Sequence, residues 1–300
     1  MKILVLNGSP KGEYSITIQT VLYLQKLYTS HEFEIVHVGQ RIKALEKDFS
    51  NMKEQLEDAD VLLFSYPVYT FLAPSQLHRF IELMKEHKVN IKDKYATQIT
   101  TSKHFYDITA HKYIEENCYD LGLRYIRGLS ADMEDLLKDQ GKKDAINFFK
   151  RFLWSVKKEI YETKPNHTNT YIMDKCEVSD KKIKQRKDKD IVILTDVMDM
   201  NSNLGKMIQR FQNQFTYETR IVNISEYPFQ GGCLGCFRCA VSEKCVYKDE
   251  FDIFLREKIQ KADAIIYALQ LKIIQWDLDL KCMMIEISVM DIVQLLLVCQ

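Results

Sequence analysis

Four cysteines lie close together in the segment 233–245, with the spacing C-x2-C-x2-C-x5-C. They are Cys233, Cys236, Cys239 and Cys245. The first three are too close along the chain for ordinary disulfide pairing, and the glycines in and before the run let the backbone fold tightly. A run of thiolates in one segment suits a [4Fe-4S] cluster, whereas structural zinc usually takes two C-x2-C pairs from separate segments. The pattern favours a cluster, with zinc and with inert or redox-active thiols as the alternatives.

The bulk composition fits a protein of about two domains and gives no sign of nucleic-acid or membrane binding. The chain has 300 residues, of which 46% are hydrophobic, and 42 basic residues balance 42 acidic ones. The basic stretch 181–189 is interrupted by acidic residues, which is typical of a solvated connection. No signal peptide or membrane span is apparent, so we expect a cytoplasmic protein whose cysteines are reduced. For the scattered cysteines, Cys118, Cys176, Cys282 and Cys299, we expect burial.

Short apolar runs alternate with amphipathic stretches through the first half of the chain. The expected elements are strands at 3–6, 33–38, 61–64, 95–100 and 124–128, and helices at 15–28, 42–57, 75–86, 109–117 and 143–161. A β-α-β order of this kind implies a parallel sheet covered by helices on both faces. The sequence therefore predicts an α/β fold with a complete doubly wound domain in this half.

The same pattern starts again in the second half. Residues 190–195 align with 2–7, residues 219–224 stand in the place of 33–38, and residues 261–267 match 58–64. The two copies diverge after Ala268, where the second lacks the loop that follows the third strand of the first. Two tandem doubly wound sheets, the second incomplete, are the economical interpretation. The expected boundaries are 1–162 for the first domain, 163–189 for a linker, 190–270 for the partial second domain and 271–300 for an atypical tail of a truncated or frameshifted chain.

The segment after the first expected strand has the composition of an anion-binding loop. Ser9, Lys11, Ser15 and Thr17 lie around the start of the first helix. Unpaired amides and the positive end of a helix favour a phosphate, and hydroxyls add further donors. The segment lacks G-x-G-x-x-G and also the ATP-binding loop motif, so flavin mononucleotide (FMN), with a single terminal phosphate, fits better than a dinucleotide. The alternative is a plain strand-to-helix turn with a serine cap.

Two further segments should reach the same edge of the sheet. One follows the third strand and contains Pro67, Val68, Tyr69 and Thr70, whose backbone and aromatic atoms could line a flat ring. The other ends the fourth strand and offers the hydroxyls of Thr101 and Ser102. Packing in the core is the alternative role for the aromatic residues.

With these motifs, the chain resembles the flavodoxin-like NAD(P)H-dependent FMN reductases, and its second half resembles the iron-sulfur flavoproteins. The resemblance rests on Gly8-Ser-Pro10 with Ser15, on Pro67-Val-Tyr69 and on the four cysteines. It implies FMN held by Ser9, Lys11, Ser15, Thr17, Pro67, Val68, Tyr69, Thr70, Thr101 and Ser102, a cluster held by the cysteines, NAD(P)H as reductant, a small-molecule or protein electron acceptor, and pairing in a homodimer. No side chain stands out as a general acid or base.

The sequence departs from the family pattern at two places. Lys103 stands where family members usually have a small residue. In the second copy, Asp196 and Asp199 stand in the position of the phosphate loop, where inward-pointing carboxylates would repel a phosphate. We therefore expect FMN in the first domain and not in the second. The alternative function is a non-catalytic binding or regulatory protein with structural zinc or redox-sensitive thiols.

Overall fold

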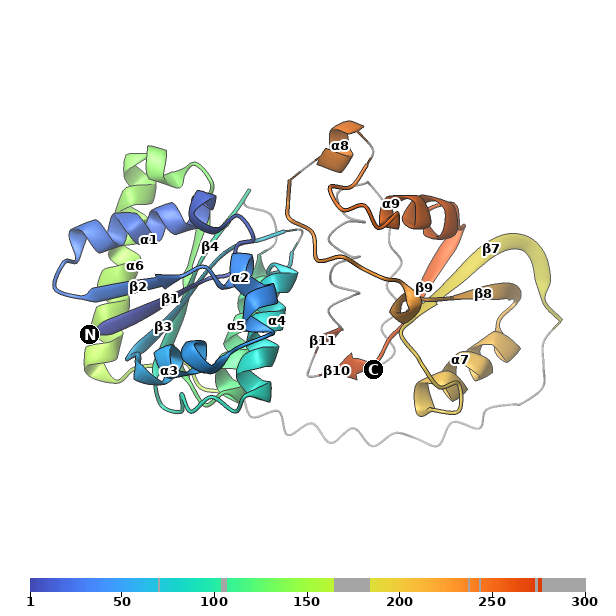
Figure 1. Ribbon diagram of the computed structural model, residues 1–300, viewed down its shortest axis with the longest axis horizontal. Coiled ribbons are helices and arrows are strands. Elements are labelled where there is room, and N and C mark those ends of the chain that lie inside the picture. Colours follow the sequence, from blue (N-terminus) through green and yellow to red (C-terminus); the bar gives the residue numbers. More distant parts are fainter. Residues whose placement is uncertain are drawn as a thin grey trace. The chain divides into compact units, whose positions relative to one another are not determined.

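The computed structural model describes residues 1–69, 71–103, 107–164, 184–236, 238–242, 244–272 and 275–276. The chain divides into two compact units, Met1–His167 and Thr168–Gln300 (Figure 1). Each unit is described by itself.

The first unit is built on one parallel sheet. Its strands are β1 (Lys2–Asn7), β2 (Glu32–Val36), β3 (Val61–Pro67), β4 (Tyr95–Ser102), β5 (Arg124–Tyr125) and β6 (Leu129–Asp132). The order is β2-β1-β3-β4-β5, and β6 also pairs with β4. In this order the chain builds outward in both directions from β1 and β3, and ligands of such sheets bind beyond the carboxyl ends of the strands at this switch point.

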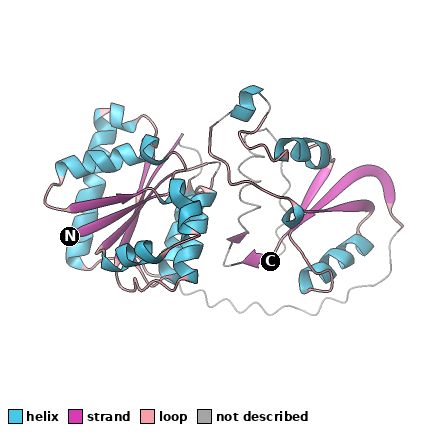
Figure 2. Ribbon diagram, viewed as in Figure 1, coloured by secondary structure: helices cyan, strands magenta, loops and turns pink. Residues whose placement is uncertain are grey.

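Helices cover both faces of this sheet (Figure 2). They are α1 (Ile16–Leu27), α2 (Val38–Leu45), α3 (Ser50–Asp58), α4 (Ser75–Glu86), α5 (Ile108–Asp120) and α6 (Asp139–Lys158), with short 3-10 turns at Gly12–Tyr14 and Asp135–Leu137. Because side chains alternate along a strand, Ile3 and Val5 pack in a core with residues of α1 and α6, whereas Leu4 and Leu6 pack in a core with residues of α2 to α5. The predicted doubly wound α/β fold is confirmed for this half of the chain.

Two of the expected elements were wrong in detail. The single helix expected at 42–57 is two helices, α2 and α3, because the chain turns between them to bury Phe49. The ring of Phe49 lies 5.8 Å from that of Phe80 and 4.8 Å from that of His87, measured between centroids. Of the strand expected at 124–128, only Arg124–Tyr125 is a strand, β5, and β6 begins after it at Leu129. Between the two, Gly128 approaches the backbone of Gln98 too closely for any side chain.

The second unit contains a smaller parallel sheet, with the order β8-β7-β9. Its elements include β7 (Arg186–Thr195), α7 (Asn203–Gln214), β8 (Tyr217–Asn223), a 3-10 turn at Ile224–Glu226, α8 (Arg238–Ser242), α9 (Phe251–Phe254), a π-helical turn at Leu255–Ile259 and β9 (Ala264–Ala268). The order repeats that of β2, β1 and β3. The predicted second, incomplete parallel sheet is therefore confirmed.

Most of the expected linker and tail lies outside the described residues. Of the linker, 165–183 is not described, and β7 already begins at Arg186. In the expected tail, the described residues are β10 (Leu271–Lys272) and β11 (Gln275–Trp276), which form an antiparallel pair. The boundaries and the truncated tail therefore stay predictions.

Helices long and apolar enough to cross a bilayer do not occur in the described parts of the chain.

Candidate functional site

The loop after β1 is shaped by the side chain of Asn7. Its amide nitrogen donates to the carbonyl of Gly12, at 2.8 Å, and contacts Nδ1 of His37, at 2.9 Å. Its amide oxygen accepts from the backbone N–H of Ser9, at 3.1 Å. Ser9 Oγ in turn accepts from the N–H of Lys11, at 3.2 Å. These bonds fix the loop in a compact form without any bound molecule.

Glycines bring two other elements against this loop. The N–H of Gly8 donates to the carbonyl of Ser65 on β3, at 2.9 Å. A Cβ on Gly39 of α2 would lie 2.3 Å from the carbonyl oxygen of Gly8, so only glycine allows the helix to approach so closely. Gly12 has a φ of +55°, which glycine adopts at little cost. The loop is therefore held by β3, by α2 and by its own turn.

Helix α1 begins at this loop with an unused cap. Ser15 is the N-cap residue, it is 2% exposed, and its hydroxyl caps no backbone amide. Among the described residues, Ser15 Oγ has no hydrogen-bond partner. A buried hydroxyl without a partner is unfavourable by about 1–3 kcal/mol, so its presence at a helix N-terminus points to an anionic ligand.

The start of α1 is joined to the end of β4 by two hydroxyls. Thr17 Oγ1 and Thr101 Oγ1 lie 2.6 Å apart, and both residues are buried. The next residue, Ser102, carries a second buried hydroxyl, which is also without a partner in the described part of the chain. Each partner of the Thr17–Thr101 contact therefore has an unsatisfied buried hydroxyl near it in sequence: Ser15 precedes Thr17 and Ser102 follows Thr101.

The loop after β3 lies at the same edge. The N–H of Val68 donates to the carbonyl of Thr101, at 2.9 Å. Tyr69 and Leu72 exchange two backbone hydrogen bonds, at 2.9 and 3.1 Å, which close a tight turn. Within this turn Phe71 has a φ of +71°, a rare conformation for a residue other than glycine. Pro67, Val68 and Tyr69 are half-buried and open to this edge of the sheet.

The structure thus brings most of the predicted flavin-site residues to the carboxyl edge around β1, β3 and β4. Thr70 lies outside the described residues. Lys103 is exposed, and its Nζ lies 3.2 Å from Oε1 of Glu134. Asn7, His37 and Gly39 were not predicted. Asn7 could have been found as a polar residue that ends a buried strand, whereas the approach of α2 depends on tertiary packing.

The corresponding loop of the second unit differs from that of the first in its cap and in its charge. Ser202 Oγ caps α7 by accepting from the N–H of Gly205, at 3.1 Å. Asp196 is 4% exposed, and its Oδ1 accepts from the N–H of Gln270, at 2.9 Å. The second oxygen of this carboxylate, Oδ2, is buried without a partner in the described residues. A buried carboxylate at this position would repel a phosphate, so binding of FMN in the first unit alone stays our prediction.

The four cysteines lie on the segment between β8 and α9. Cys233, Cys239 and Cys245 are half-buried, Cys236 is exposed, and none takes part in a disulfide. The two ends of the segment are held together, because Tyr247 OH donates to the carbonyl of Gly232, at 3.1 Å, and the N–H of Gln230 donates to Asp249 Oδ2, at 3.0 Å.

The thiol chemistry fits a metal, but the described geometry does not yet form a metal site. Four thiolates are the donor set of structural zinc and of [4Fe-4S] clusters. In the described residues, no group of three or more potential ligands lies within reach of one ion. Cys118 is buried as predicted, and burial raises the pKa of its thiol, so it is a packing residue.

Several solved structures and one protein family are similar to parts of this chain. The chain resembles the solved structures of an NADH:FMN oxidoreductase in its apo form (18% identity, 55% of this chain and 91% of that one, TM-score 0.44) and of an FMN-dependent NADH-azoreductase from Bacillus anthracis str. Ames Ancestor (16% identity, 52% and 98%, TM-score 0.42). It also resembles a flavoenzyme NAD(P)H:(acceptor) oxidoreductase from Paracoccus denitrificans (23% identity, 42% and 74%, TM-score 0.36). No curated protein matches the chain. Residues 1–131 match the family described as "Flavodoxin-like fold".

Proposed function

We propose that the first unit binds FMN at the carboxyl edge of its sheet and that the protein is a flavin-dependent NAD(P)H oxidoreductase. One observation carries the proposal. Two buried hydroxyls, Ser15 Oγ at the start of α1 and Ser102 Oγ at the carboxyl end of β4, lack partners in the described structure. Unsatisfied buried donors of this kind indicate a polar ligand, and the positive end of α1 selects an anionic one.

The fit of FMN can be assigned to three groups of residues. Ser9, Lys11, Ser15 and Thr17 would hold the phosphate at the start of α1. Thr101 and Ser102 would contact the polar part of the cofactor, and Pro67, Val68, Tyr69 and Thr70 would lie along the ring. Because the loop is already fixed by Asn7, binding would need little reorganisation of the backbone.

When bound, FMN would accept hydride from NAD(P)H and pass electrons to a small-molecule or protein acceptor. The residues of this chain would bind and orient the cofactor, and no side chain is assigned a proton-transfer role. The likeness of the loop motifs to NAD(P)H-dependent FMN reductases motivates the choice of reductant. Pairing of two chains is a further expectation of the same likeness.

A direct experiment tests the proposal. The apoprotein is titrated with FMN, and the complex is then mixed anaerobically with NADH or NADPH while the visible absorbance of the flavin is followed. We expect saturable binding and loss of the flavin absorbance with one of the two reductants. Binding without reduction by either would leave the non-catalytic alternative.

A second proposal concerns the four cysteines. We infer that they form a metal site, in which the four thiols come together when the metal binds. A [4Fe-4S] cluster is the first candidate, and zinc is the second. The contact of Tyr247 with Gly232 supports this, because it holds the segments that bear Cys233 and Cys245 side by side. A bound cluster would add one-electron transfer. Analysis of iron, sulfide and zinc after anaerobic purification separates these metals from redox-active thiols, for which no metal is expected.

A further inference from the structure

The side chains of two neighbouring residues of β4 point to opposite faces of the sheet. Thr101 contacts Thr17 on the α1 side, whereas Thr100 contacts His111 of α5 on the other side. Side chains alternate along a strand, so both contacts act on the same short piece of backbone. The end of β4, which leads into Ser102, is therefore clamped from both faces.

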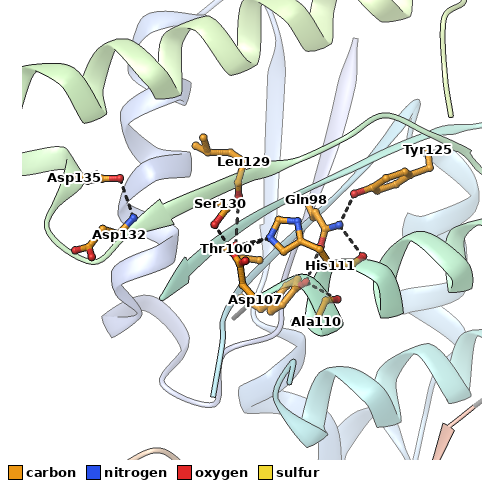
Figure 3. A network of polar contacts seen from close by, with 11 residues as sticks. Gln98, Thr100, Asp107, Ala110, His111, Tyr125, Leu129, Ser130, Asp132 and Asp135 are labelled. Atoms are coloured by element: carbon orange, nitrogen blue, oxygen red, sulfur yellow. Dashed lines mark hydrogen bonds and ion pairs between the residues drawn. The ribbon is translucent and has the colours of Figure 1, made fainter. Parts of the chain in front are cut away.

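The clamp on the α5 side is a chain of polar contacts (Figure 3). His111 Nε2 lies 2.8 Å from Thr100 Oγ1 and 3.5 Å from Oδ2 of Asp107. Ser130 of β6 donates its hydroxyl to the same carboxylate oxygen. Since Thr100 and Ser130 are paired in register in the sheet, α5, β4 and β6 are tied together at this point.

The clamp borders a cavity of about 420 Å³, which is open to solvent. The charged and titratable groups that surround His111 are Asp107, Lys112 and Glu115 of α5, Tyr125 of β5, Arg127 between β5 and β6, and Glu162 after α6. Protons can therefore reach the histidine without unfolding of the unit.

We propose that His111 is a positioning residue for the flavin site, which holds Thr101 and Ser102 in place through Thr100 and makes FMN affinity depend on the protonation of its ring. The proposal rests on the proposed function. The neutral ring, with its proton on Nδ1, accepts a hydrogen bond from Thr100. The protonated ring donates from Nε2, and the carboxylate of Asp107 is a stronger acceptor for it than the hydroxyl of Thr100, so its hydrogen bond moves to Asp107. The Thr100 hydroxyl, which then has no acceptor on the ring, donates to the carbonyl of Leu129, 3.4 Å away.

The direction of the pH effect follows from the burial of the ring. Burial lowers the pKa of His111, although the charge of Asp107 opposes this. The folded protein therefore binds fewer protons at this site than the unfolded chain. The contribution of the neutral ring to the stability of the unit is complete above the unfolded pKa of about 6.5 and is lost as the pH falls through the lower folded value. FMN affinity should fall over the same range, because Thr101 and Ser102 are then held less firmly.

The experiment measures the FMN dissociation constant of the full chain from about pH 8 to about pH 5, a range that covers histidine titration. The variants are His111→Gln, whose amide can bond Thr100 but does not titrate here, and His111→Leu, which cannot bond Thr100. Lys112→Gln is the matched control, because Lys112 is the exposed neighbour in the same helix and lines the same cavity. Thermal unfolding at each pH shows that each variant is folded.

We expect the FMN phosphate itself, with a second pKa near 6, to add the same pH dependence to every variant. The result that supports the proposal is a steeper loss of affinity at low pH in the wild type and in Lys112→Gln than in His111→Gln, with His111→Leu about tenfold weaker at high pH. If FMN affinity depended on pH in the same way in the wild type and in His111→Gln, the inference about His111 would be overturned and the proposed function would stand. A wild type that does not bind FMN at any pH would overturn the proposed function, and the inference with it.

Discussion

Thr17 Oγ1 and Thr101 Oγ1 lie 2.6 Å apart, although 84 residues separate them along the chain. The contact joins the N-terminal turn of α1 to the carboxyl end of β4. The two halves of the proposed flavin site therefore stand in a fixed relationship before any cofactor is present. The site therefore forms only when the whole unit is folded, and one loop alone could not form it.

The first prediction concerns the two serine caps. Ser15→Asp should weaken FMN binding at least tenfold, because it places a carboxylate where the phosphate would lie, while α1 stays intact since Asp is a good N-cap. Isothermal titration with FMN measures the effect. The matched control is Ser202→Ala, which removes the satisfied cap of α7. It should cost about 1 kcal/mol of stability in the second unit and leave FMN affinity unchanged. Full FMN affinity in Ser15→Asp would contradict the phosphate assignment.

The second prediction concerns the threonine pair. Thr17→Val and Thr101→Val should each destabilise the first unit by about 1–3 kcal/mol, because each leaves one buried hydroxyl without its partner. The double variant should lose less than the sum of the two, and urea unfolding of all four proteins gives the coupling free energy. Thr97→Val is the control on the same strand, since the Thr97 hydroxyl is buried and has no partner in the described residues. It should leave stability unchanged or increase it. Simple additivity of the two threonine substitutions would show that their contact contributes nothing.

The third prediction concerns the approach of α2 to the loop after β1. Gly39→Ala should reduce FMN affinity, because the new Cβ would lie 2.3 Å from the carbonyl oxygen of Gly8 and must displace the loop. In an unhindered helix the same substitution stabilises by about 0.5–1 kcal/mol, so a loss of both stability and affinity is diagnostic of the clash. Arg41→Ala, at an exposed position in the same helix, is the control. Unchanged FMN binding in Gly39→Ala would show that the position of the loop does not matter to the cofactor.

The sequence predicted the elements with strong local patterns and missed those set by packing. The helix at 75–86 was predicted with the bounds that the structure shows, because its apolar residues recur at the helical period. The break between α2 and α3 was missed, because it depends on the burial of Phe49 against Phe80 and His87. Local apolar content cannot show which residue of a polar stretch finds a partner far away in the chain.

The candidate site was predictable to a similar extent. Parallel strands present their carboxyl ends at one edge, so the loops after β1, β3 and β4 could be placed together from their order alone. The partners of individual hydroxyls could not be predicted. Nothing in the sequence distinguishes Ser15, whose cap is unused, from Ser202, whose cap is closed by Gly205. Nor does it show that Thr100 and Thr101 contact different helices.

The most direct test of the central claim is the titration of the apoprotein with FMN, followed by flavin fluorescence, for the wild type and for Ser15→Asp side by side. Saturable binding by the wild type with markedly weaker binding by Ser15→Asp is the predicted result. No saturable binding by the wild type, or equal binding by the two proteins, would contradict the claim that the carboxyl edge of the first sheet is a flavin site.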